Sequence, residues 1–265
     1  MTSVDLDLII SNISRVLAAL MLAISAMVIS RWQHLDLERD MLVAVIRAFF
    51  QLLAIGFVLE FIFATDRVFW IILIILMMIL VAGYTAGRRA NLVPNSQKIA
   101  TVAVTVGAVL TLGILITLGV FPFEARYVIP IAGMIVGNSM VVTGLVMTRL
   151  RDDLKLQRPQ IEAALALGAT PRQASIDQMR RAMATGMTPI VDNTKTVGLI
   201  SLPGAMTGMI LAGVSPLEAV QIQIIVMYML MGAAAFSGLT AAFLSQPQFF
   251  TNSYQLVSSA LIDER

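Results

Sequence analysis

The sequence predicts an all-α protein that crosses a membrane several times, and three observations lead to this prediction. Hydrophobic residues make up 58% of the 265 positions and charged residues 13%, with a mean hydropathy of +0.87. Uncharged stretches such as 99–121 and 127–148 are each long enough to cross ~30 Å of hydrocarbon as a helix. They lack the alternation of apolar and polar residues found in membrane β-barrels, so helices are expected to satisfy their backbone in lipid.

The predicted architecture is a transmembrane helical bundle in one permease-like domain, residues 1–265. We expect about seven spans, at residues 6–30, 41–63, 68–87, 98–120, 127–148, 188–212 and 218–244. Lys and Arg indicate the orientation, because loops rich in these residues stay in the cytoplasm. The connections after the third and fifth spans carry most of them. The N-terminus is therefore expected outside and the C-terminus inside, in the inner (plasma) membrane.

The composition excludes several classes of function. There is no cysteine and a single histidine, His34, which excludes thiolate metal sites and sites that need two imidazoles per chain. No G-x-x-x-x-G-K-[ST] motif occurs, so any ATP hydrolysis would require another subunit. The segment 137–140 has the form of a rhomboid nucleophile but lacks a histidine base on a neighbouring helix. We expect no catalytic residue, no cofactor bound by this chain and no nucleic-acid partner.

In the second span, polar side chains are candidates for a transport pathway. Arg47 and Gln51 are four residues apart and share a helix face, which should point away from lipid. Glu60 lies near the outer end of the same span. A structural role is the alternative for each charge, because Arg47 can extend to the interface and Glu60 can pair there.

The fifth span combines small residues with one amide. Gly133 and Gly137 have the spacing that predicts close packing against a second helix. Asn138 follows them and is a pathway candidate. The alternative is that Asn138 forms a polar link between helices.

The basic connection at about 158–184 is the element expected to meet a soluble partner. A helix is predicted over 159–167, because Gly168 suits the left-handed conformation that closes a helix. A second helix is predicted over 172–184, because Pro171 pre-sets the backbone of a first helical turn. The expected structure is a cytoplasmic helix, a tight corner and a second helix leading back to the membrane.

The sixth predicted span is unusually polar. Asp192 and Lys195 are three residues apart, so they can pair or face a common cavity. Pro203 removes a backbone donor and Gly204 loosens the helix, which predicts a kink or break near them. Broken helices line the pathway of many transporters. A structural ion pair near the cytoplasmic surface is the alternative. The next span begins with a capping signal at 215–218.

Several segments resemble a known family. Residues 162–164 spell Glu-Ala-Ala and, with Gly168, look like the EAA loop of ABC transporter permeases. Three longer segments resemble the FetB-type iron-export permeases, a family that also includes plant permeases implicated in aluminium tolerance. These segments are IPIAGMIVGNSM (129–140), LGATPRQAS (167–175) and TPIVDNTKTVGLISLPGAMTGMILAGVSPLEA (188–219).

The resemblance implies the membrane subunit of an ABC transporter that exports iron or another metal. ATP and Mg would be bound by a separate subunit similar to FetA, and two copies of each subunit would form the complex. Residues 159–170 would dock on that subunit, with coupling carried by Glu162, Ala163, Ala164, Gly168 and Ala169. No metal ligands are assigned. Two alternatives stay open: an ion- or proton-coupled secondary transporter, and ABC export of a non-metal solute such as a nucleotide sugar.

Overall fold

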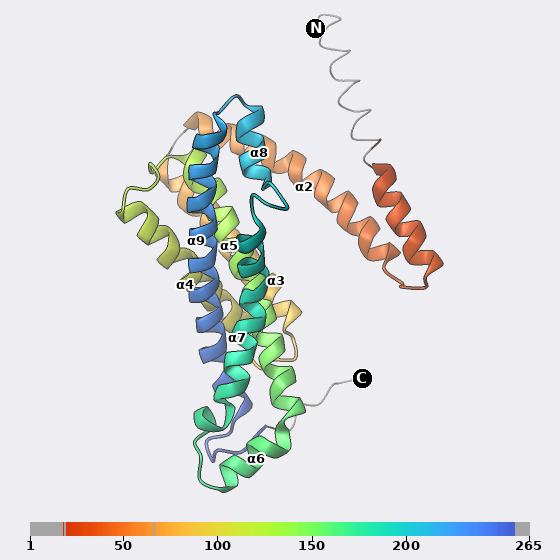
Figure 1. Cartoon of the computed structure of the whole chain (residues 1–265), viewed down its shortest axis with the longest axis vertical. Coiled ribbons are helices and arrows are strands. Elements are labelled where there is room, and N and C mark those ends of the chain that lie inside the picture. The colour runs from red at the N-terminus through yellow and green to blue at the C-terminus, as the bar shows by residue number, and fades with distance from the viewer. Residues whose placement is uncertain (1–17, 19, 66, 258–265) are drawn as a thin grey trace, which may run out of the picture. The chain divides into compact units, whose positions relative to one another are not determined.

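The computed structural model describes residues 18, 20–65 and 67–257, and these form two compact units, one within residues 1–65 and the other within residues 66–265. The described residues are almost entirely helical and contain no strand, only two isolated bridges, which confirms the all-α prediction (Figure 1). Five helices among them are long and apolar enough to cross a membrane.

The first unit contains two apolar helices joined by a turn. The first runs over Leu20–Trp32, and α2 runs over Glu38–Thr65. In the turn, the buried Ser30 hydroxyl accepts a hydrogen bond from the Leu37 N–H at 3.3 Å. Most of the first predicted span, residues 6–17 and 19, lies outside the described residues. The second predicted span, 41–63, is confirmed as part of α2.

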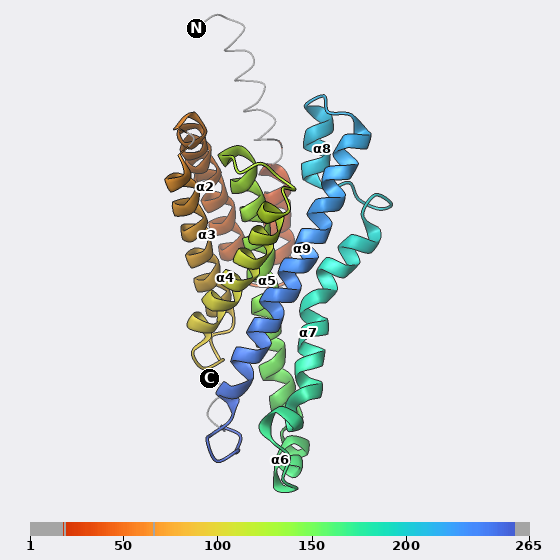
Figure 2. The same ribbon diagram turned by 90° about the vertical axis from the view of Figure 1, so that its left-hand side faces the viewer.

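The second unit holds the remaining helices. They are α3 (Val68–Arg89), α4 (Ser96–Thr117), α5 (Ala125–Leu156), α6 (Arg158–Ala166), α7 (Pro171–Thr196), α8 (Gly204–Leu211), α9 (Pro216–Ser245) and the 3-10 helix η1 (Gln246–Phe249). Helices α3, α4, α5 and α9 are candidate spans and match four of the predicted ones. Both views place α6 and α8 at opposite ends of this unit, with α7 and α9 running side by side between them (Figure 2).

Small residues bring α4, α5 and α9 into close contact. A Cβ atom added at Gly107 of α4 would lie 2.8 Å from the Ser139 hydroxyl of α5 and 2.8 Å from Cβ of Ser237 on α9. The predicted packing at Gly133 and Gly137 is not found. A Cβ atom at Gly137 would meet nothing within 4 Å, and one at Gly133 only a methionine methyl at 3.9 Å. The spacing of these two glycines therefore did not predict close packing against a helix of this unit.

The predicted boundaries around the sixth span are wrong. Helix α7 runs without interruption from Pro171 to Thr196, so the predicted helix at 172–184 and the start of the span at 188 are one element. The chain leaves helical conformation over 197–203 and re-enters it at Gly204. The predicted break is therefore present, but it begins before Pro203. Packing of buried α7 residues against α5 and α9 offsets the backbone hydrogen bond that is lost at the internal Pro189.

Candidate functional site

The α6 end of the second unit forms the predicted helix, corner and second helix. The Ala169 N–H donates to the Ala164 carbonyl at 3.0 Å, and the Gly168 N–H donates to the next carbonyl at 3.0 Å, with Gly168 at φ +92°. These two bonds form a Schellman motif, which closes α6. Thr170 then caps α7, because its hydroxyl accepts from the Gln173 N–H while the Gln173 side chain accepts from the Thr170 N–H. Local hydrogen bonds therefore fix the shape of the corner.

A network of side chains ties this corner to neighbouring helices. Gln157 lies where α5 meets α6, and its side-chain oxygen Oε1 accepts from the Gln178 amide at 2.8 Å and from the Arg181 guanidinium at 2.9 Å, both on α7. The Gln246 amide of η1 donates to the buried Ser175 hydroxyl of α7 at 3.1 Å. The sequence analysis missed these residues. Ser175 and Gln178 are three residues apart and share one face of α7. This spacing of polar residues was the sequence signal for a contact with a neighbouring helix.

The predicted coupling residues occupy the outer surface of α6 and the corner. Glu162 and Ala163 are exposed, and Ala164 is half-buried. The Glu162 carboxylate pairs with the Arg158 guanidinium of its own helix at 2.7 Å. Neighbouring atoms leave room for a side chain at position 168, since an added Cβ atom would meet nothing within 4 Å. The requirement for glycine here is therefore conformational.

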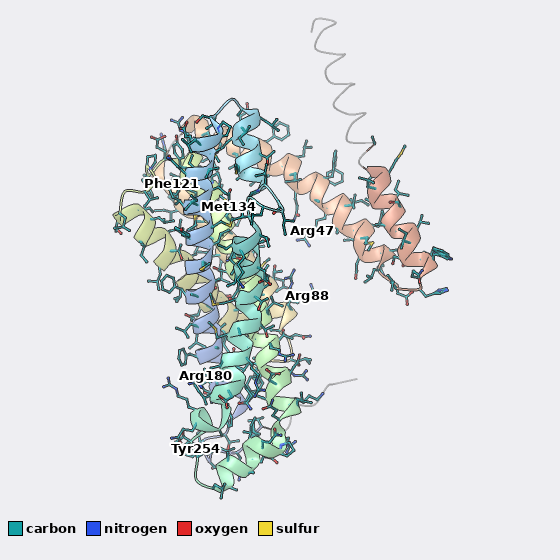
Figure 3. All side chains as sticks on the ribbon, viewed as in Figure 1. Arg47, Arg88, Phe121, Met134, Arg180 and Tyr254 are labelled. Carbon is teal, nitrogen blue, oxygen red and sulfur yellow. The ribbon has the colours of Figure 1, made fainter. Side chains whose placement is uncertain are left out.

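A groove of about 550 Å³ separates α6 from the segment that follows η1. Glu162 and Leu165 line one side of the groove, and Ser253–Leu256 line the other. The second side is held in place by a bridge between Phe250 and Leu256. Tyr254, which is exposed, lies at this end of the unit together with Arg180 (Figure 3). Sequence analysis gave no role to this segment.

The register between α7 and α9 shows which part of α9 the polar residues of α7 lie beside. The two helices meet in the antiparallel pairs Ser175 with Gln246 and Met183 with Gly238, and farther along Thr194 and Met227 line the same hollow. Each step forward along α7 therefore matches one step back along α9. This register places Asp192 and Lys195 level with the middle of α9, a candidate membrane span.

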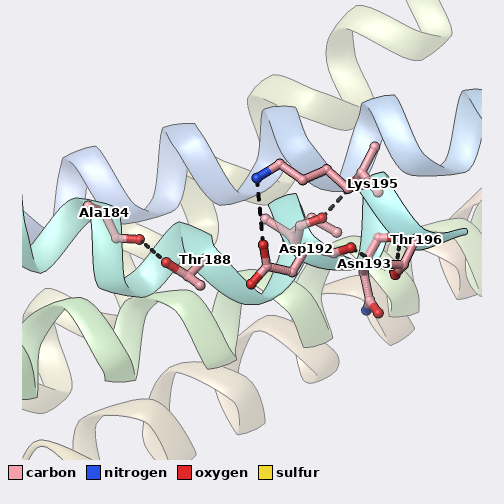
Figure 4. A network of polar contacts seen from close by, with 8 residues as sticks. Ala184, Thr188, Asp192, Asn193, Lys195 and Thr196 are labelled. Carbon is pink, nitrogen blue, oxygen red and sulfur yellow. Dashed lines mark hydrogen bonds and ion pairs between the residues drawn. The ribbon is translucent and has the colours of Figure 1, made fainter.

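Asp192 and Lys195 form an ion pair on the surface of the second unit. Their charged atoms are 3.7 Å apart, and their side chains are 61% and 70% exposed (Figure 4). The pair therefore occupies an exposed face of α7.

The remaining predicted pathway residues are spread over the molecule. Pro203 caps α8 and Gly204 is its first residue, so the two lie where the break ends. The Asn138 amide donates to the Leu230 carbonyl at 2.8 Å and links α5 to α9, as its alternative interpretation predicted. The other three, Arg47, Gln51 and Glu60, lie on α2 in the first unit and stay predictions. Within residues 18, 20–65 and 67–257, no three His, Cys, Asp or Glu residues are grouped to hold a metal ion.

The profile of the uncharacterised protein family UPF0014 matches residues 13–250. The chain belongs to this family. It is 54% identical over 239 residues to the Protein ALUMINUM SENSITIVE 3 of Arabidopsis thaliana, covering 90% of this chain and 88% of that protein. The UPF0014 membrane protein STAR2 of Oryza sativa subsp. japonica is 53% identical over 239 residues, covering 90% and 84%.

A bacterial UPF0014 relative carries a more specific name. The Probable iron export permease protein FetB of Escherichia coli (strain K12) is 41% identical over 243 residues, covering 92% of this chain and 94% of that protein. No solved structure matches the chain. The relatives confirm the family resemblance that the sequence segments indicated. The UPF0014 match includes the corner, the whole of α7 and the helix break.

Proposed function

We propose that the chain is the permease subunit of an ABC transporter that exports iron or another metal. A separate FetA-like subunit would bind ATP and Mg and dock on the corner, and two copies of each subunit would form the complex. The chain would cross the inner membrane about seven times, with the N-terminus outside. The observation that carries the proposal is the corner between α6 and α7. It lies outside the candidate spans and continues directly into α7, which packs along the candidate spans α5 and α9.

The continuity of α7 gives the proposal a mechanism. The helix has 26 residues, which corresponds to a length of ~39 Å at 1.5 Å per residue. One end is the corner, and the other end carries Lys195 and the break. A movement imposed on α6 by the closing ATP-binding subunits would pass along this single element to the charged pair. The groove beside Glu162 supports docking, because it offers a partner a concave surface next to the EAA-like residues.

The exposed ion pair of α7 supports a pathway for a polar solute. In the proposed complex, the α7 face that carries Asp192 and Lys195 would line a water-filled passage between two copies. The carboxylate of Asp192 suits a hard metal such as Fe(III). A metal would then be held by residues of both copies, or it would cross as a complex with its own ligands. An anionic solute such as a nucleotide sugar would instead use the cation of Lys195.

The test is ATP hydrolysis by the complex in lipid. The chain is co-expressed with the P-loop protein encoded beside it, and ATPase activity is measured with and without the chain. We expect a stable complex whose hydrolysis depends on this chain and falls about tenfold in Glu162→Gln, as for loss of one hydrogen bond to a charged group.

Glu124→Gln is the matched control. Glu124 forms a similar ion pair, with Arg126 at 2.8 Å, at the opposite end of α5. Hydrolysis should be unchanged in this control. Absence of both association and hydrolysis would contradict the proposal and favour an ion-coupled secondary transporter, in which Asp192 and Glu60 would be the first residues to titrate.

A further inference from the structure

Three basic residues gather where the candidate spans α3 and α4 meet. Arg88 and Arg89 are the last two residues of α3, and Lys98 lies in the first turn of α4. Gly87 lets the two helix ends approach closely, since an added Cβ atom would lie only 2.5 Å from the Cα atom of Gln97. Two neighbouring spans therefore bring three cations to one end of the membrane-spanning part.

No acidic residue of α3 or α4 balances these three cations. The sequence contains no Asp or Glu over residues 67–123, a range that includes both helices. All three cations are exposed, and none of them forms an ion pair within the described residues. The acidic residues near the end of α5, Asp152 and Asp153, already pair with Arg151 and Arg149. A negatively charged group would therefore meet uncompensated positive charge here.

Arg89 reaches from α3 to α5. Its Cδ atom lies 3.8 Å from the position of a Cβ atom added at Gly144, so its stem crosses α5 at this glycine. One turn farther along α5 is Thr148, which is exposed and lines a hollow of about 30 Å³ together with Arg89. A guanidinium and a hydroxyl are both donors, and a guanidinium can bind two phosphate oxygens at once.

An exposed apolar strip leads from Thr148 back into the span. Leu145 and Val141 lie three and seven residues before Thr148, so all three share one face of α5. Their side chains are 38% and 37% exposed. The uncharged part of α5 ends at residue 148 and that of α3 ends at residue 87. The donors therefore lie where the hydrocarbon part of both helices is expected to end, at the level of lipid headgroups.

We propose that this end of α3 binds one anionic phospholipid of the surrounding bilayer. The lipid phosphate lies against Arg89 and Thr148, and an acyl chain follows the strip of Leu145 and Val141. The other two cations attract the headgroup, as basic residues next to a membrane span do. A lipid fits better than a free anion, because only a lipid also covers the apolar strip.

The lipid site is separate from the corner between α6 and α7. Figure 3 shows Arg88 apart from Arg180, which lies on α7 near the corner. Binding of a lipid here requires no ATP-binding subunit. The inference therefore does not depend on the proposed ABC function.

The test is native mass spectrometry of the full chain in a neutral detergent, which counts bound lipids. The chain is titrated with dioleoylphosphatidylglycerol and with dioleoylphosphatidylcholine, which have the same acyl chains but differ in net charge. We expect the first phosphatidylglycerol to bind about tenfold more tightly than the first phosphatidylcholine. Inorganic phosphate at the same concentration as the lipid should not displace it.

Variants assign the preference to this site. Arg89→Gln should lose the preference of about tenfold, whereas Arg89→Lys keeps the charge but not the fork of donors and should lose only part of it. Thr148→Val keeps the shape of an exposed side chain and should weaken phosphatidylglycerol severalfold, which gives a second test with Arg89 in place. The control is Arg67→Gln, which removes the same charge from an exposed position at the opposite end of α3 and should change nothing.

Four results would overturn the proposal. Equal binding of the two lipids would show that the cations select no headgroup, and full preference in Arg89→Gln would place the lipid elsewhere. An equal loss in Arg67→Gln would indicate general attraction of positive charge, and displacement by inorganic phosphate would indicate a site for free anions. None of these results bears on ATP hydrolysis, so failure of this site and failure of the proposed transporter are distinguishable.

Discussion

Replacing Gly168 tests whether the shape of the corner carries coupling. Gly168 closes α6 at φ +92°, and an added Cβ atom would meet nothing within 4 Å. A Gly168→Ala change therefore causes no clash, and its effect is the cost of placing an L-residue in the left-handed region, about 1–2 kcal/mol. That cost lowers the population of the native corner by a factor of roughly 5–30. Gly168→Val should cost more, because a β-branched residue is least tolerant of this conformation.

The assay measures chain-dependent ATP hydrolysis and the affinity for the ATP-binding subunit in nanodiscs. We expect ATP hydrolysis and affinity to be highest in the unchanged protein and to fall progressively in Gly168→Asn, Gly168→Ala and Gly168→Val. Asn comes before Ala because it tolerates the left-handed conformation better. Membrane insertion should be unchanged in all three variants, because the chain beyond the corner keeps its packing.

The control is a second Schellman motif at the other end of the unit. Gly213 closes α8 at φ +94°, its N–H donates to the Ile210 carbonyl, and an added Cβ atom also meets nothing. Gly213→Ala should lower thermal stability as much as Gly168→Ala but leave affinity for the ATP-binding subunit intact. Normal coupling in Gly168→Val would refute the reasoning, and so would an equal loss of affinity in Gly213→Ala.

Two further predictions concern α7. Asp192→Asn should reduce transport into or out of proteoliposomes at least severalfold while ATP hydrolysis persists. The control is Asp177→Asn, which disrupts a similar exposed i,i+3 ion pair near the corner and should leave transport unchanged. Unchanged transport in Asp192→Asn would mean that the pair of Asp192 and Lys195 is structural. Gly186→Ala should lower stability by about 1–3 kcal/mol, because its Cβ atom would overlap a valine methyl of α5. Gly137→Ala should be nearly neutral in the same thermal melt, and a reversed order would contradict the packing described for these glycines.

The parts predicted correctly from the sequence depend on local chemistry. Gly168 ends a helix because it accepts a left-handed backbone, and Pro171 begins the next one. Ser215 caps α9 by accepting from the Glu218 N–H at 3.3 Å, as its spacing predicted. Each of these signals involves residues within a few positions of one another, so no knowledge of the fold is needed.

The parts that were missed depend on contacts between distant segments. The bond from Gln246 to Ser175 joins residues 71 positions apart, and nothing in either local sequence indicates the other. Helix α5 extends to Leu156, two turns beyond its predicted end at 148, since its last turns leave the apolar region and are stabilised by packing and ion pairs instead. Hydropathy detects the apolar part of such a helix and not its polar extension.

The uninterrupted path of α7 constrains how the proposed coupling can work. Two helices joined by a flexible link near 185–187 would absorb a movement of the corner before it reached Asp192. One helix instead moves both ends together, and the first non-helical residues after the corner are those at 197–203. Inverting a 1:99 ratio of two states requires about 5.5 kcal/mol, so energy from ATP must arrive at the pathway with little loss. When α7 moves as one rigid helix, the backbone must bend at the break over 197–203. This break follows Asp192 and Lys195 in the chain, so the movement reaches the charged pair first.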